Sequence, residues 1–516
     1  MFAKRYSPDE LIDIIAAPSY SPEIINYVKK VSSEPFLSQF LSQKPKLGIT
    51  GTIAKDYVEG DTKGAVPYVS TKQVKGLHAY IDDAKYISKE ADIEWAKCRV
   101  EDGDIIINKS GNVGAAAVLC CAPYAYANSV SDIINIKLAK SSEIDRDYLV
   151  VYLNSPYGQK QLQRLSGGAI FSHVSLHAIP DIRIFHPDIK AQKYIGDKVR
   201  QAEQLRAWAK QVVTSLRREF ENLYRPISHY DSFKRMSYPI RPDQLFEVLT
   251  PASYPPHIEK YFEENPNVTL GEICSQIYIG KTLASVESRE GVKQATSRSC
   301  SGLFLKQPMN LVERKGNVDP LAKKDILLTN AAHDKNYIGK DVSFNHSDEL
   351  ILPSTKVLVI RLKECGIPAS YVHAYLMTEA GYTQWQAIVR GISAGIHPSD
   401  VARIRIPVPD NRAQLETMAV KADDLYIQAG LAQEVSRLLT IAAKNLVEAL
   451  IEGQLTEQQL IQAQQALEDG DNSLDQAILS KLSNQGYAIE GATPLFSDID
   501  ELYRLLESAA QTEAEE

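Results

Sequence analysis

A glycine-containing loop is the first stretch whose residues could do chemistry. Residues 103–119 read GDIIINKSGNVGAAAVL, in which an apolar strand at 105–107 leads into a polar loop with Lys109, Gly111 and Gly114. Glycine lets a backbone turn tightly or approach a ligand closely. The loop could therefore cradle a phosphate, contact DNA or only close a hairpin. The chain contains neither GxxxxGKS nor GxxxxGKT, and no G-x-G, so no Walker loop or dinucleotide turn is indicated.

Two further patterns point to catalysis only weakly. NSPY at 154–157 resembles the N-P-P-Y motif of amino-methyltransferases, but it follows the helical stretch DYLVVYLNS, so a turn at a helix end is the preferred interpretation. Five Pro-Asp pairs invite a nuclease interpretation, yet three flank predicted helix starts, where aspartate caps free N–H groups. The six cysteines form no CxxC pair and the histidines no HExxH, so we predict no metal site and expect buried, unreactive cysteines.

The net charge of −8 is concentrated at the C-terminus. Residues 451–516 carry 14 acids and 2 bases, so the other 450 residues carry 51 acids and 55 bases. The body of the chain is therefore mildly basic, which permits DNA binding without demanding it. The composition is that of a soluble globular protein, and the N-terminus has no signal-peptide core, so a cytoplasmic location is expected.

The sequence contains an internal duplication. With an offset of 234, residues 7–28 (SPDELIDIIAAPSYSPEIINYV) match 241–262 (RPDQLFEVLTPASYPPHIEKYF) at eight positions. The matching residues of the first copy are Pro8, Asp9, Leu11, Ser19, Tyr20, Pro22, Ile24 and Tyr27. The repeat continues with small shifts, pairing Leu47-Gly48 with Leu270-Gly271, 103–107 with 324–328, 147–155 with 370–378, and 172–187 with 396–409. Such a duplication predicts two similar domains.

Each half closes with a long helix whose apolar residues recur every three or four positions. The second helix, roughly 411–452, has no proline and keeps this spacing for five heptads; the first, roughly 189–224, has the same rhythm. The residues expected at a helix–helix interface are Val199, Ala202, Val213, Leu216, Phe220, Leu415, Met418, Leu425, Leu439 and Leu446. The alternative is that each helix packs only on its own domain.

These patterns predict an α+β fold. Two similar mixed α/β domains stand in tandem, each followed by a long helix, and the helices pair as an antiparallel coiled coil with pseudo-two-fold symmetry. The predicted segments are an N-terminal arm (1–40), a first domain (41–187), a first helix (188–225), a second arm (236–265), a second domain (266–409), a second helix (410–455) and an acidic C-terminal extension (456–516). A rigid spacer with two inverted domains suits DNA, a ligand with two separated sites.

With these segments in order, the chain resembles the DNA-specificity subunit of type I restriction–modification systems. The resemblance covers about residues 45–455 and rests on VPYVSTKQV (66–74), the loop at 103–119, YLNSPYGQKQL (152–162) and SGGAIFSHVSLHAIPDIRIFHP (166–187). YLMTEAGYTQW (375–385), IRIPVP (404–409) and IEGQLTEQQL (451–460) repeat or complete the pattern. The sequence departs from the family in its long arms, its acidic extension and its second half, where TNAAHDKNYIGK (329–340) replaces the glycine loop.

The resemblance implies two target-recognition domains that each read half of a bipartite DNA site, with the helices as a spacer. It further implies a non-catalytic subunit that binds double-stranded DNA, two methyltransferase subunits and, through them, restriction/translocase subunits. No cofactor is expected on this chain, and S-adenosylmethionine is expected on the methyltransferase partners. The alternatives are a protein scaffold built on the paired helices that does not read DNA, and a methyltransferase or nuclease with an unrecognised site.

Polar and basic loop residues are the candidate DNA contacts, because Lys and Arg meet phosphates while Arg, Lys, Asn, Gln, Ser and Thr read base edges. In the first domain the candidates are Lys72, Gln73, Asn108, Lys109, Ser110, Ser172, His173 and Ser175. In the second they are Lys306, Gln307, Asn330, His333, Lys335, Asn336, Arg390, Ser393 and His397. Gln73 and Gln307 align at the offset of 234, and Arg298 is a further possible contact.

Overall fold

The chain of 516 residues divides into two compact units in a computed structural model. The structure describes residues 17–82, 84–167, 173–233, 239–240, 242, 245, 249–286, 291–314, 318–364, 366–391 and 394–515. The first unit joins Met1–Leu205 to Val435–Ala514, and the second consists of Arg206–Glu434 with Glu515–Glu516. Each unit holds one mixed α/β domain, which we call its head.

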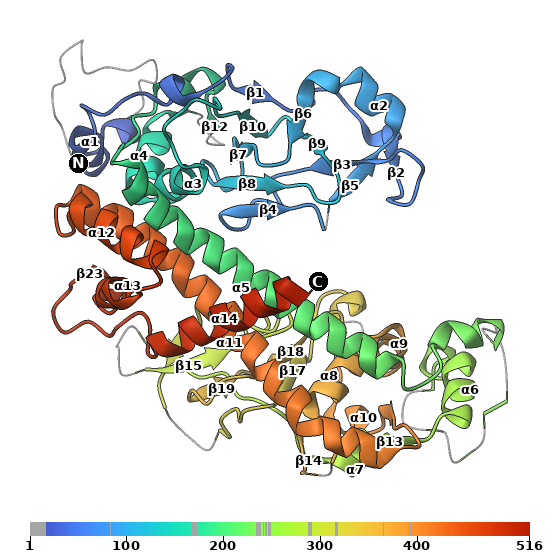
Figure 1. The fold of residues 1–516 in the computed structure, drawn as a ribbon. Coiled ribbons are helices and arrows are strands. Elements are labelled where there is room, and N and C mark those ends of the chain that lie inside the picture. The colour runs from blue at the N-terminus through green and yellow to red at the C-terminus, as the bar shows by residue number, and fades with distance from the viewer. Residues whose placement is uncertain are drawn as a thin grey trace. The chain divides into compact units, whose positions relative to one another are not determined.

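The first head contains two five-stranded sheets (Figure 1). One has the order β1 (Lys46–Leu47), β10 (Ile133–Ile136), β7 (Ile105–Asn108), β8 (Ala116–Cys120), β4 (His78–Tyr80). The other has the order β2 (Tyr57–Val58), β5 (Lys85–Ile87), β3 (Val66–Val69), β9 (Tyr126–Ser129), β6 (Arg99–Glu101). Buried side chains from both sheets, among them Val100, Ile106 and Ala127, form one core, as expected for short strands rich in β-branched residues.

Short helices complete the first unit. They are η2 (Ala17–Tyr20), α1 (Pro22–Lys30), η3 (Leu37–Phe40), η4 (Ala54–Asp56), α2 (Lys89–Glu94), η5 (Ala96–Cys98), α3 (Arg146–Asn154), α4 (Pro156–Arg164) and η6 (Leu176–Asp181), with a small ribbon of β11 (Ser166–Gly167) and β12 (His173–Val174). Pro22 opens α1 behind a Ser21 cap, and Ser155 caps α4 in the same way before Pro156.

The second head repeats this plan with fewer strands. Its sheets are β14 (Cys274–Ile279), β20 (Val357–Leu362), β17 (Ile326–Thr329), β18 (Val342–Phe344); β16 (Asn310–Val312), β15 (Val292–Ala295), β19 (Ile351–Pro353); and β13 (Asn267–Thr269) with β21 (Arg405–Pro407). Its helices are η7 (Ile227–Phe233), η9 (Pro251–Ser253), α6 (Pro256–Glu264), α7 (Leu270–Ile273), η10 (Lys335–Tyr337), α8 (Ala369–Leu376), α9 (Glu379–Ala387) and α10 (Pro398–Val401). α6 begins 234 residues after α1, as the repeat predicts.

Two long helices, α5 (Ile189–Glu221) and α11 (Arg412–Ile451), pack together (Figure 1). The first unit contains the N-terminal part of α5 and the C-terminal part of α11, and the second unit contains the remaining parts, so the helices run antiparallel. At 1.5 Å per residue they are about 50 and about 60 Å long. The predicted fold class, tandem mixed domains with paired helices, is confirmed. No described helix is long and apolar enough to cross a bilayer.

The acidic C-terminal extension is folded onto the first unit. It consists of α12 (Glu457–Glu468), α13 (Ser473–Leu479), a hairpin of β22 (Leu482–Ser483) and β23 (Gly486–Tyr487), and α14 (Ile499–Glu515). Asp475 lies at its centre, where it accepts hydrogen bonds from the hydroxyls of Tyr194 and Tyr503 and pairs with Lys198 at 2.7 Å. The Lys198 and Asp475 side chains are 0% and 1% exposed, so this is a wholly buried ion pair with α5.

A buried glutamine shows how closely the heads repeat. Gln161 on α4 donates to the Tyr152 hydroxyl (3.0 Å) and to the Arg183 carbonyl (2.9 Å), and its Oε1 accepts from the Arg183 N–H (2.8 Å). Gln384 on α9 makes the same three bonds, at 3.0, 3.0 and 2.9 Å, to Tyr375 and Arg405. Residues that make the same backbone or side-chain hydrogen bonds in the two units are hereafter called equivalent.

Equivalence corrects two pairings made from the sequence. The Gly48 N–H donates to the Ile133 carbonyl (3.2 Å), and the Gly280 N–H donates to the Val357 carbonyl (3.2 Å) at the same place in the second sheet. Gly48 is therefore equivalent to Gly280, and the pairing of Leu47-Gly48 with Leu270-Gly271 is wrong. The identical dipeptide misled because Leu270 follows β13, whereas Gly280 follows β14, the strand that occupies the place of β1.

The second correction concerns Gln73. Its Oε1 accepts from the Ser70 N–H (2.9 Å), as the Ser299 hydroxyl accepts from the Thr296 N–H (3.2 Å). The segment VSTKQV (69–74) thus corresponds to ATSRSC (295–300), and Gln73 is equivalent to Ser299 rather than Gln307. The offset of 234 holds in the arms but falls to 226 here, because loops of different length separate the strands.

Candidate nucleic-acid interface

Three loops of the first head converge at the end of β7. The side-chain amide of Asn108 donates to the Thr71 carbonyl (3.5 Å), and the Lys109 carbonyl accepts from the Val174 N–H (3.2 Å). The Lys109 N–H donates to the Asp132 carbonyl (2.8 Å), which holds the loop against the start of β10. We call residues 70–74, 108–114 and 173–175 the first loop edge.

The first loop edge brings together the described candidates of its head. Lys72, His173 and Ser175 are exposed, and Lys109 and Ser110 are half-buried. The Ser110 hydroxyl donates to the Asp132 carboxylate at 2.6 Å. Ser172 lies outside the described residues. Basic and hydroxyl side chains therefore meet within one set of loops, although they come from segments a hundred residues apart.

Two amide candidates of this edge are mostly buried. Gln73 is 8% exposed and its Oε1 accepts from both the N–H and the hydroxyl of Ser70, at 2.9 Å each. Asn108 is 1% exposed, and its Oδ1 has no hydrogen-bond partner in the described structure. These side chains shape the turn and the strand end, and their contacts with bases stay predictions.

The second head has the same arrangement. The Asn330 carbonyl accepts from the Ile396 N–H (2.9 Å) and its N–H donates to the Lys356 carbonyl (3.1 Å), so Asn330 is equivalent to Lys109. The Ala332 N–H donates to the Ala394 carbonyl (2.9 Å) and ties the same two loops a second time. We call residues 296–300, 329–332 and 394–397 the second loop edge.

The candidates of the second head are spread more widely. His333, Lys335, Asn336, His397 and Lys306 are exposed, Gln307 is half-buried, Asn330 is 8% exposed, and Ser393 lies outside the described residues. The Lys306 ammonium donates to the carbonyl and hydroxyl of Ser301, at 2.6 and 3.1 Å. The Arg390 guanidinium pairs with Asp400, whose side chain is 3% exposed. Asn330 and His397 belong to the second loop edge, and the others lie on neighbouring segments.

The shared hydrogen bonds of the two heads identify Arg298 as the counterpart of a candidate DNA contact. The sequence alone gave it only as a further possible contact. Because Gln73 is equivalent to Ser299, Arg298 takes the place of Lys72, and both side chains are exposed at the tip of the same turn. The signal in the sequence was the match of STKQ with TSRS, in which a hydroxyl residue precedes the cation in both copies. It was missed because the fixed offset pointed to Gln307.

The helix residues predicted at the interface are mostly buried. Met418 and Leu425 are half-buried, and the other eight are less than 9% exposed. Neighbours outside the heptad rhythm, such as Trp208 and Tyr426, are buried as well. The Phe220 ring packs edge-on against Tyr371 of α8, with 5.0 Å between centroids, so α5 also contacts the second head. Which of these residues contact the other helix stays a prediction.

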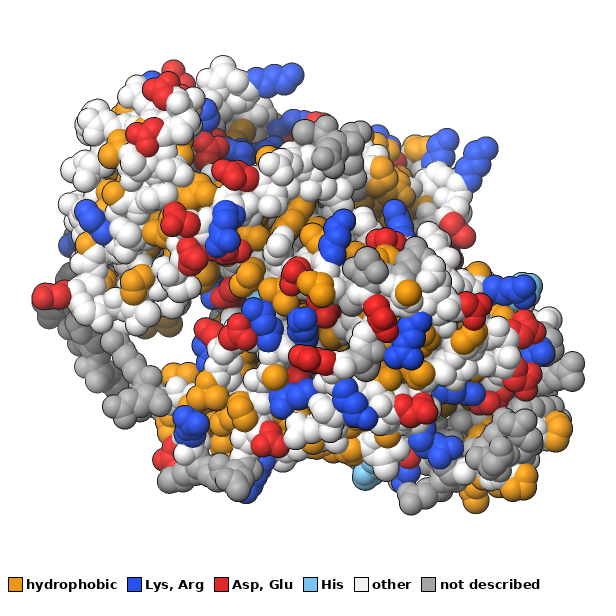
Figure 2. Space-filling model, turned by 60° about the horizontal axis from the view of Figure 1, so that its bottom comes forward, with side chains coloured by type: hydrophobic (Ala, Val, Ile, Leu, Met, Phe, Trp, Pro, Cys, Tyr) orange, Lys and Arg blue, Asp and Glu red, His pale blue; other side chains and the backbone are white. Residues whose placement is uncertain are grey.

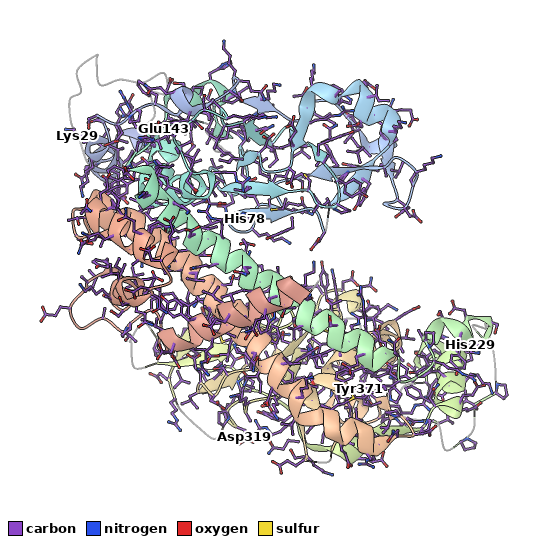
Figure 3. The ribbon with its side chains drawn as sticks, viewed as in Figure 1. Lys29, His78, Glu143, His229, Asp319 and Tyr371 are labelled. Carbon is purple, nitrogen blue, oxygen red and sulfur yellow. The ribbon has the colours of Figure 1, made fainter. Side chains whose placement is uncertain are left out.

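A charged network joins the first head to α5. His78 on β4, labelled in Figure 3, lies 3.4 Å from Asp147 and, by its other ring nitrogen, 3.6 Å from Glu203. Burial lowers the pKa of His78, but hydrogen bonds to these two carboxylates outweigh it and raise the pKa to about 8. Arg200 completes the network through Asp145 (3.1 Å) and Asp147 (2.5 Å). Phe304 occupies the place of His78 in the second head, where it packs against His346 and Tyr426.

The residues that suggested catalysis have structural partners. The Asn154 amide of NSPY donates to the Ala116 carbonyl (2.7 Å) and accepts from the Ala116 N–H (3.3 Å), so it fastens α3 to β8. No cluster of three or more His, Cys, Asp or Glu side chains suited to a metal occurs among the described residues. Cys98, Cys121, Cys274 and Cys300 are buried, and burial raises the pKa of Cys121 to about 12.

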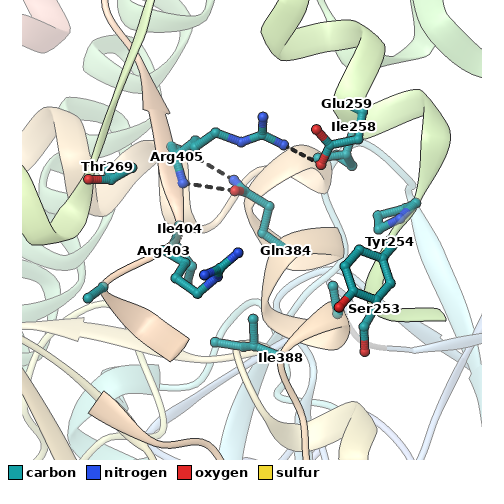
Figure 4. A pocket seen from close by; sticks show the side chains of 13 residues that line it. Ser253, Tyr254, Ile258, Glu259, Thr269, Gln384, Ile388, Arg403, Ile404 and Arg405 are labelled. Atoms are coloured by element: carbon teal, nitrogen blue, oxygen red, sulfur yellow. Dashed lines mark hydrogen bonds and ion pairs between the residues drawn. The ribbon is translucent and has the colours of Figure 1, made fainter. Parts of the chain in front are cut away.

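A cavity of about 440 Å³ lies between the second arm and its head (Figure 4). Tyr254, Gln384 and Arg403 line it, and the Arg405 guanidinium reaches Glu259 at 2.6 Å beside it. In the first head the Arg164 guanidinium lies 5.7 Å from the centre of the Tyr20 ring, at the position that Ala387 occupies in the second. The cavity is thus the place where the smaller side chain of the second copy leaves space.

Charges of both signs are mixed on one face of the molecule. On the face drawn in Figure 2, Lys and Arg side chains alternate with Asp and Glu instead of forming a region of one sign. Affinity for an anionic polymer would therefore depend on a few placed cations, such as those of the loop edges, more than on a broad basic field.

The match to a family model agrees with the resemblance seen in the sequence. Residues 49–212 match the family described as the type I restriction modification DNA specificity domain. No curated protein sequence matches the chain at a significant level. Similar solved structures include an S subunit of a type I restriction–modification system from M. genitalium, with 13% identity, 80% of this chain and 94% of that chain covered, and a TM-score of 0.42. Another is an HsdS subunit from Thermoanaerobacter tengcongensis, with 13% identity, 81% and 96% coverage, and a TM-score of 0.27.

Proposed function

We propose that the chain is a DNA-specificity subunit of a type I restriction–modification system and that each head reads one half of a bipartite site, because residues 49–212 match the type I restriction modification DNA specificity domain. The observation that carries the proposal is the loop edge, which recurs in a second head beyond the matched residues. Equivalent hydrogen bonds at Lys109 and Asn330 support two heads of one kind. Their different side chains support two different half-sites.

The loop edges supply the chemistry that DNA recognition needs. Lys72 and Arg298, exposed at equivalent turns, would contact phosphates or guanine edges, while Lys109, Ser110 and Asn330 lie at the strand ends where a groove could be read. The remaining predicted contacts, His333, Lys335, Asn336 and the others, would extend these surfaces.

The paired helices would set the distance between the half-sites and bind the partner subunits. We expect two methyltransferase subunits, which would carry S-adenosylmethionine, with restriction/translocase subunits joined through them. In this assembly the chain contributes recognition and leaves the chemistry to its partners. The family match supports the proposal that the chain works with DNA in a type I restriction–modification complex.

Sequencing of methylated adenines in cells that carry the complete system would test the proposal. We expect a bipartite motif with two different halves and a fixed gap. Duplexes that contain the motif should shift in a mobility assay with the chain and its methyltransferase partner, with an affinity that falls steeply as salt rises. A system that methylates no bipartite motif would refute two-headed reading, and methylation by the isolated chain would refute a non-catalytic role.

Lengthening both helices by one heptad tests the spacer. Seven residues keep the apolar seam in phase and add about 10 Å, which corresponds to about three base pairs. We expect the same half-sites with a longer gap. A four-residue insertion in one helix is the control, because it rotates the seam and should reduce stability. An unchanged gap in an active seven-residue variant would exclude the helices as the spacer.

A further inference from the structure

One equivalent position beside the loop edges carries opposite charges in the two heads. Lys109 donates its N–H to the Asp132 carbonyl (2.8 Å), and the equivalent Asn330 donates its N–H to the Lys356 carbonyl (3.1 Å). Asp132 and Lys356 each directly precede the strand that pairs with β7 or β17. The backbone therefore presents a carboxylate in the first head where it presents an ammonium in the second.

The neighbouring side chains of this position also differ between the two heads. The Ser110 hydroxyl donates to Asp132 Oδ1 at 2.6 Å, which fixes the carboxylate at the edge and leaves Oδ2 without a hydrogen bond to any described residue. Ala331 occupies the place of Ser110 in the second head and offers no hydroxyl. Lys356 is exposed and forms no ion pair in the described structure. The first head thus holds its carboxylate through a neighbouring hydroxyl, whereas the second head leaves its ammonium exposed beside an alanine.

We infer that Asp132 and Lys356 are specificity-determining residues that give the two heads opposite preferences at one base pair of each half-site. The inference rests on the proposed function. A carboxylate accepts hydrogen bonds and cannot donate them, so Asp132 suits an exposed amino group such as cytosine N4 in the major groove. An ammonium only donates, so Lys356 suits the O6 and N7 acceptors of guanine. A carboxylate beside phosphates is repelled, so its place on a DNA-reading edge implies a contact that compensates for the repulsion.

A competing account is that Asp132 only supports the loop through Ser110. Loop support cannot be the sole role of the Asp132 side chain, because the loop is already held by a backbone bond. The Lys109 N–H donates to the carbonyl of residue 132, and this bond forms with any side chain at that position. In the second head this backbone bond persists with lysine at the equivalent position and alanine in place of Ser110. The loop edge therefore keeps its form without the Ser–Asp contact.

The test uses the full chain assembled with its methyltransferase partner, with the methylated motif as the readout. Asp132→Asn keeps the size of the side chain but lets it donate, and Lys356→Met keeps its length but removes the charge. We expect each variant to lose at least about tenfold in discrimination at one base pair of one half-site and to leave the other half-site intact. Asp61→Asn and Lys323→Met, at exposed positions outside the loop edges, are the matched controls and should keep the wild-type motif.

Each result has a defined meaning. An unchanged motif in both variants overturns the inference while the proposed function stands, and a wild-type system without a bipartite motif refutes the proposed function itself. A uniform loss of affinity for all sequences, with a salt slope reduced by about one, would make Lys356 a phosphate contact and overturn its assignment. Should Asp132→Asn lower the melting temperature of the complex, the exposed Lys356→Met variant decides the inference alone.

Discussion

Replacing Asp475 with asparagine should detach the C-terminal extension from α5. Asp475 is the sole described carboxylate that pairs with Lys198, and both side chains are almost without solvent contact. Asparagine has the same size and can still accept from the tyrosine hydroxyls of Tyr194 and Tyr503. The substitution therefore removes one charge and leaves the ammonium of Lys198 buried without its partner.

The expected loss of stability depends on how the buried Lys198 ammonium responds when it has no carboxylate partner. Breaking a buried ion pair by removal of one partner costs about 3–5 kcal/mol. The ammonium can also escape by losing its proton, which for an ordinary lysine costs about 4.6 kcal/mol at pH 7 and about 1.9 kcal/mol at pH 9. We therefore expect the free energy of unfolding of this region to fall by about 3–4.6 kcal/mol at pH 7 and by only about 2 kcal/mol at pH 9.

Urea titration followed by a short pulse of protease would measure this loss, with cleavage within 457–515 as the signal at each pH. Glu468→Gln is the matched control, because Glu468 also pairs with α5, through Lys193 at 2.5 Å, but that pair is exposed. Its midpoint should hardly move. The double variant Lys198→Met/Asp475→Leu removes both charges and should recover most of the stability, because apolar residues of similar volume commonly replace a buried pair without loss.

A small, pH-independent effect of Asp475→Asn would refute this reasoning, since it would mean that water reaches Lys198 in the folded protein. A double variant as unstable as the single one would likewise show that packing, and not the stranded charge, decides the loss.

Three further substitutions test individual contacts. The pKa of His78 is raised to about 8 in the folded protein. Protonated His78 should therefore contribute about 2 kcal/mol to the free energy of unfolding below pH 6.5, and this contribution should be lost as the pH rises through 8. His78→Phe should abolish this pH dependence in denaturation curves measured at pH 6 and pH 8.5. Gly280→Ala should destabilise the second head severely, because a Cβ would lie 2.1 Å from the Pro353 carbonyl oxygen, whereas Gly271→Ala, at 3.2 Å from its nearest atom, should be milder; equal melting temperatures would contradict the corrected register. Gln384→Leu should cost about 2–3 kcal/mol in thermal unfolding, because it leaves the backbone groups of Arg405 unpaired in a buried site; a loss below about 1 kcal/mol would mean that water replaces the amide.

The large elements could be predicted from the sequence because their signals are long. The heptad rhythm gave two helices that the structure places at Ile189–Glu221 and Arg412–Ile451, close to the expected ranges. Eight identities in the arms marked α1 and α6 as copies. The packing of the C-terminal extension against α5 could not be predicted, because Asp475 and Lys198 are separated by 277 residues and no local pattern links them. Its acidic composition suggested an appendage, whereas its buried face includes Leu479 and Leu502.

Within the loop edges the sequence identified residue types better than positions. Polar loop residues such as Lys109 and Asn330 could be chosen by chemistry alone, and their exact correspondence appeared in the alignment of GDIII with KDILL. Gln73 could not be evaluated, because its burial depends on a turn that folds its amide back on Ser70. Asp132 was not among the candidates, because no pattern in the sequence links it to the loop; its hydrogen bonds with Lys109 and Ser110 place it beside the edge.

The duplication separates residues that build the fold from residues that differ between the two heads. Gly103, with a φ of +82°, and its equivalent Lys324, with a φ of +70°, keep the same left-handed turn before β7 and β17 although only one is glycine. Gly111 adopts a φ of +72° in open space, so the turn of the loop and not close packing requires a glycine there. The scaffold therefore tolerates different residues where its backbone requires a turn. The changes at and beside the loop edges, from lysine to asparagine and from aspartate to lysine, meet no such backbone requirement, which is what the proposed reading of different bases by the two heads predicts.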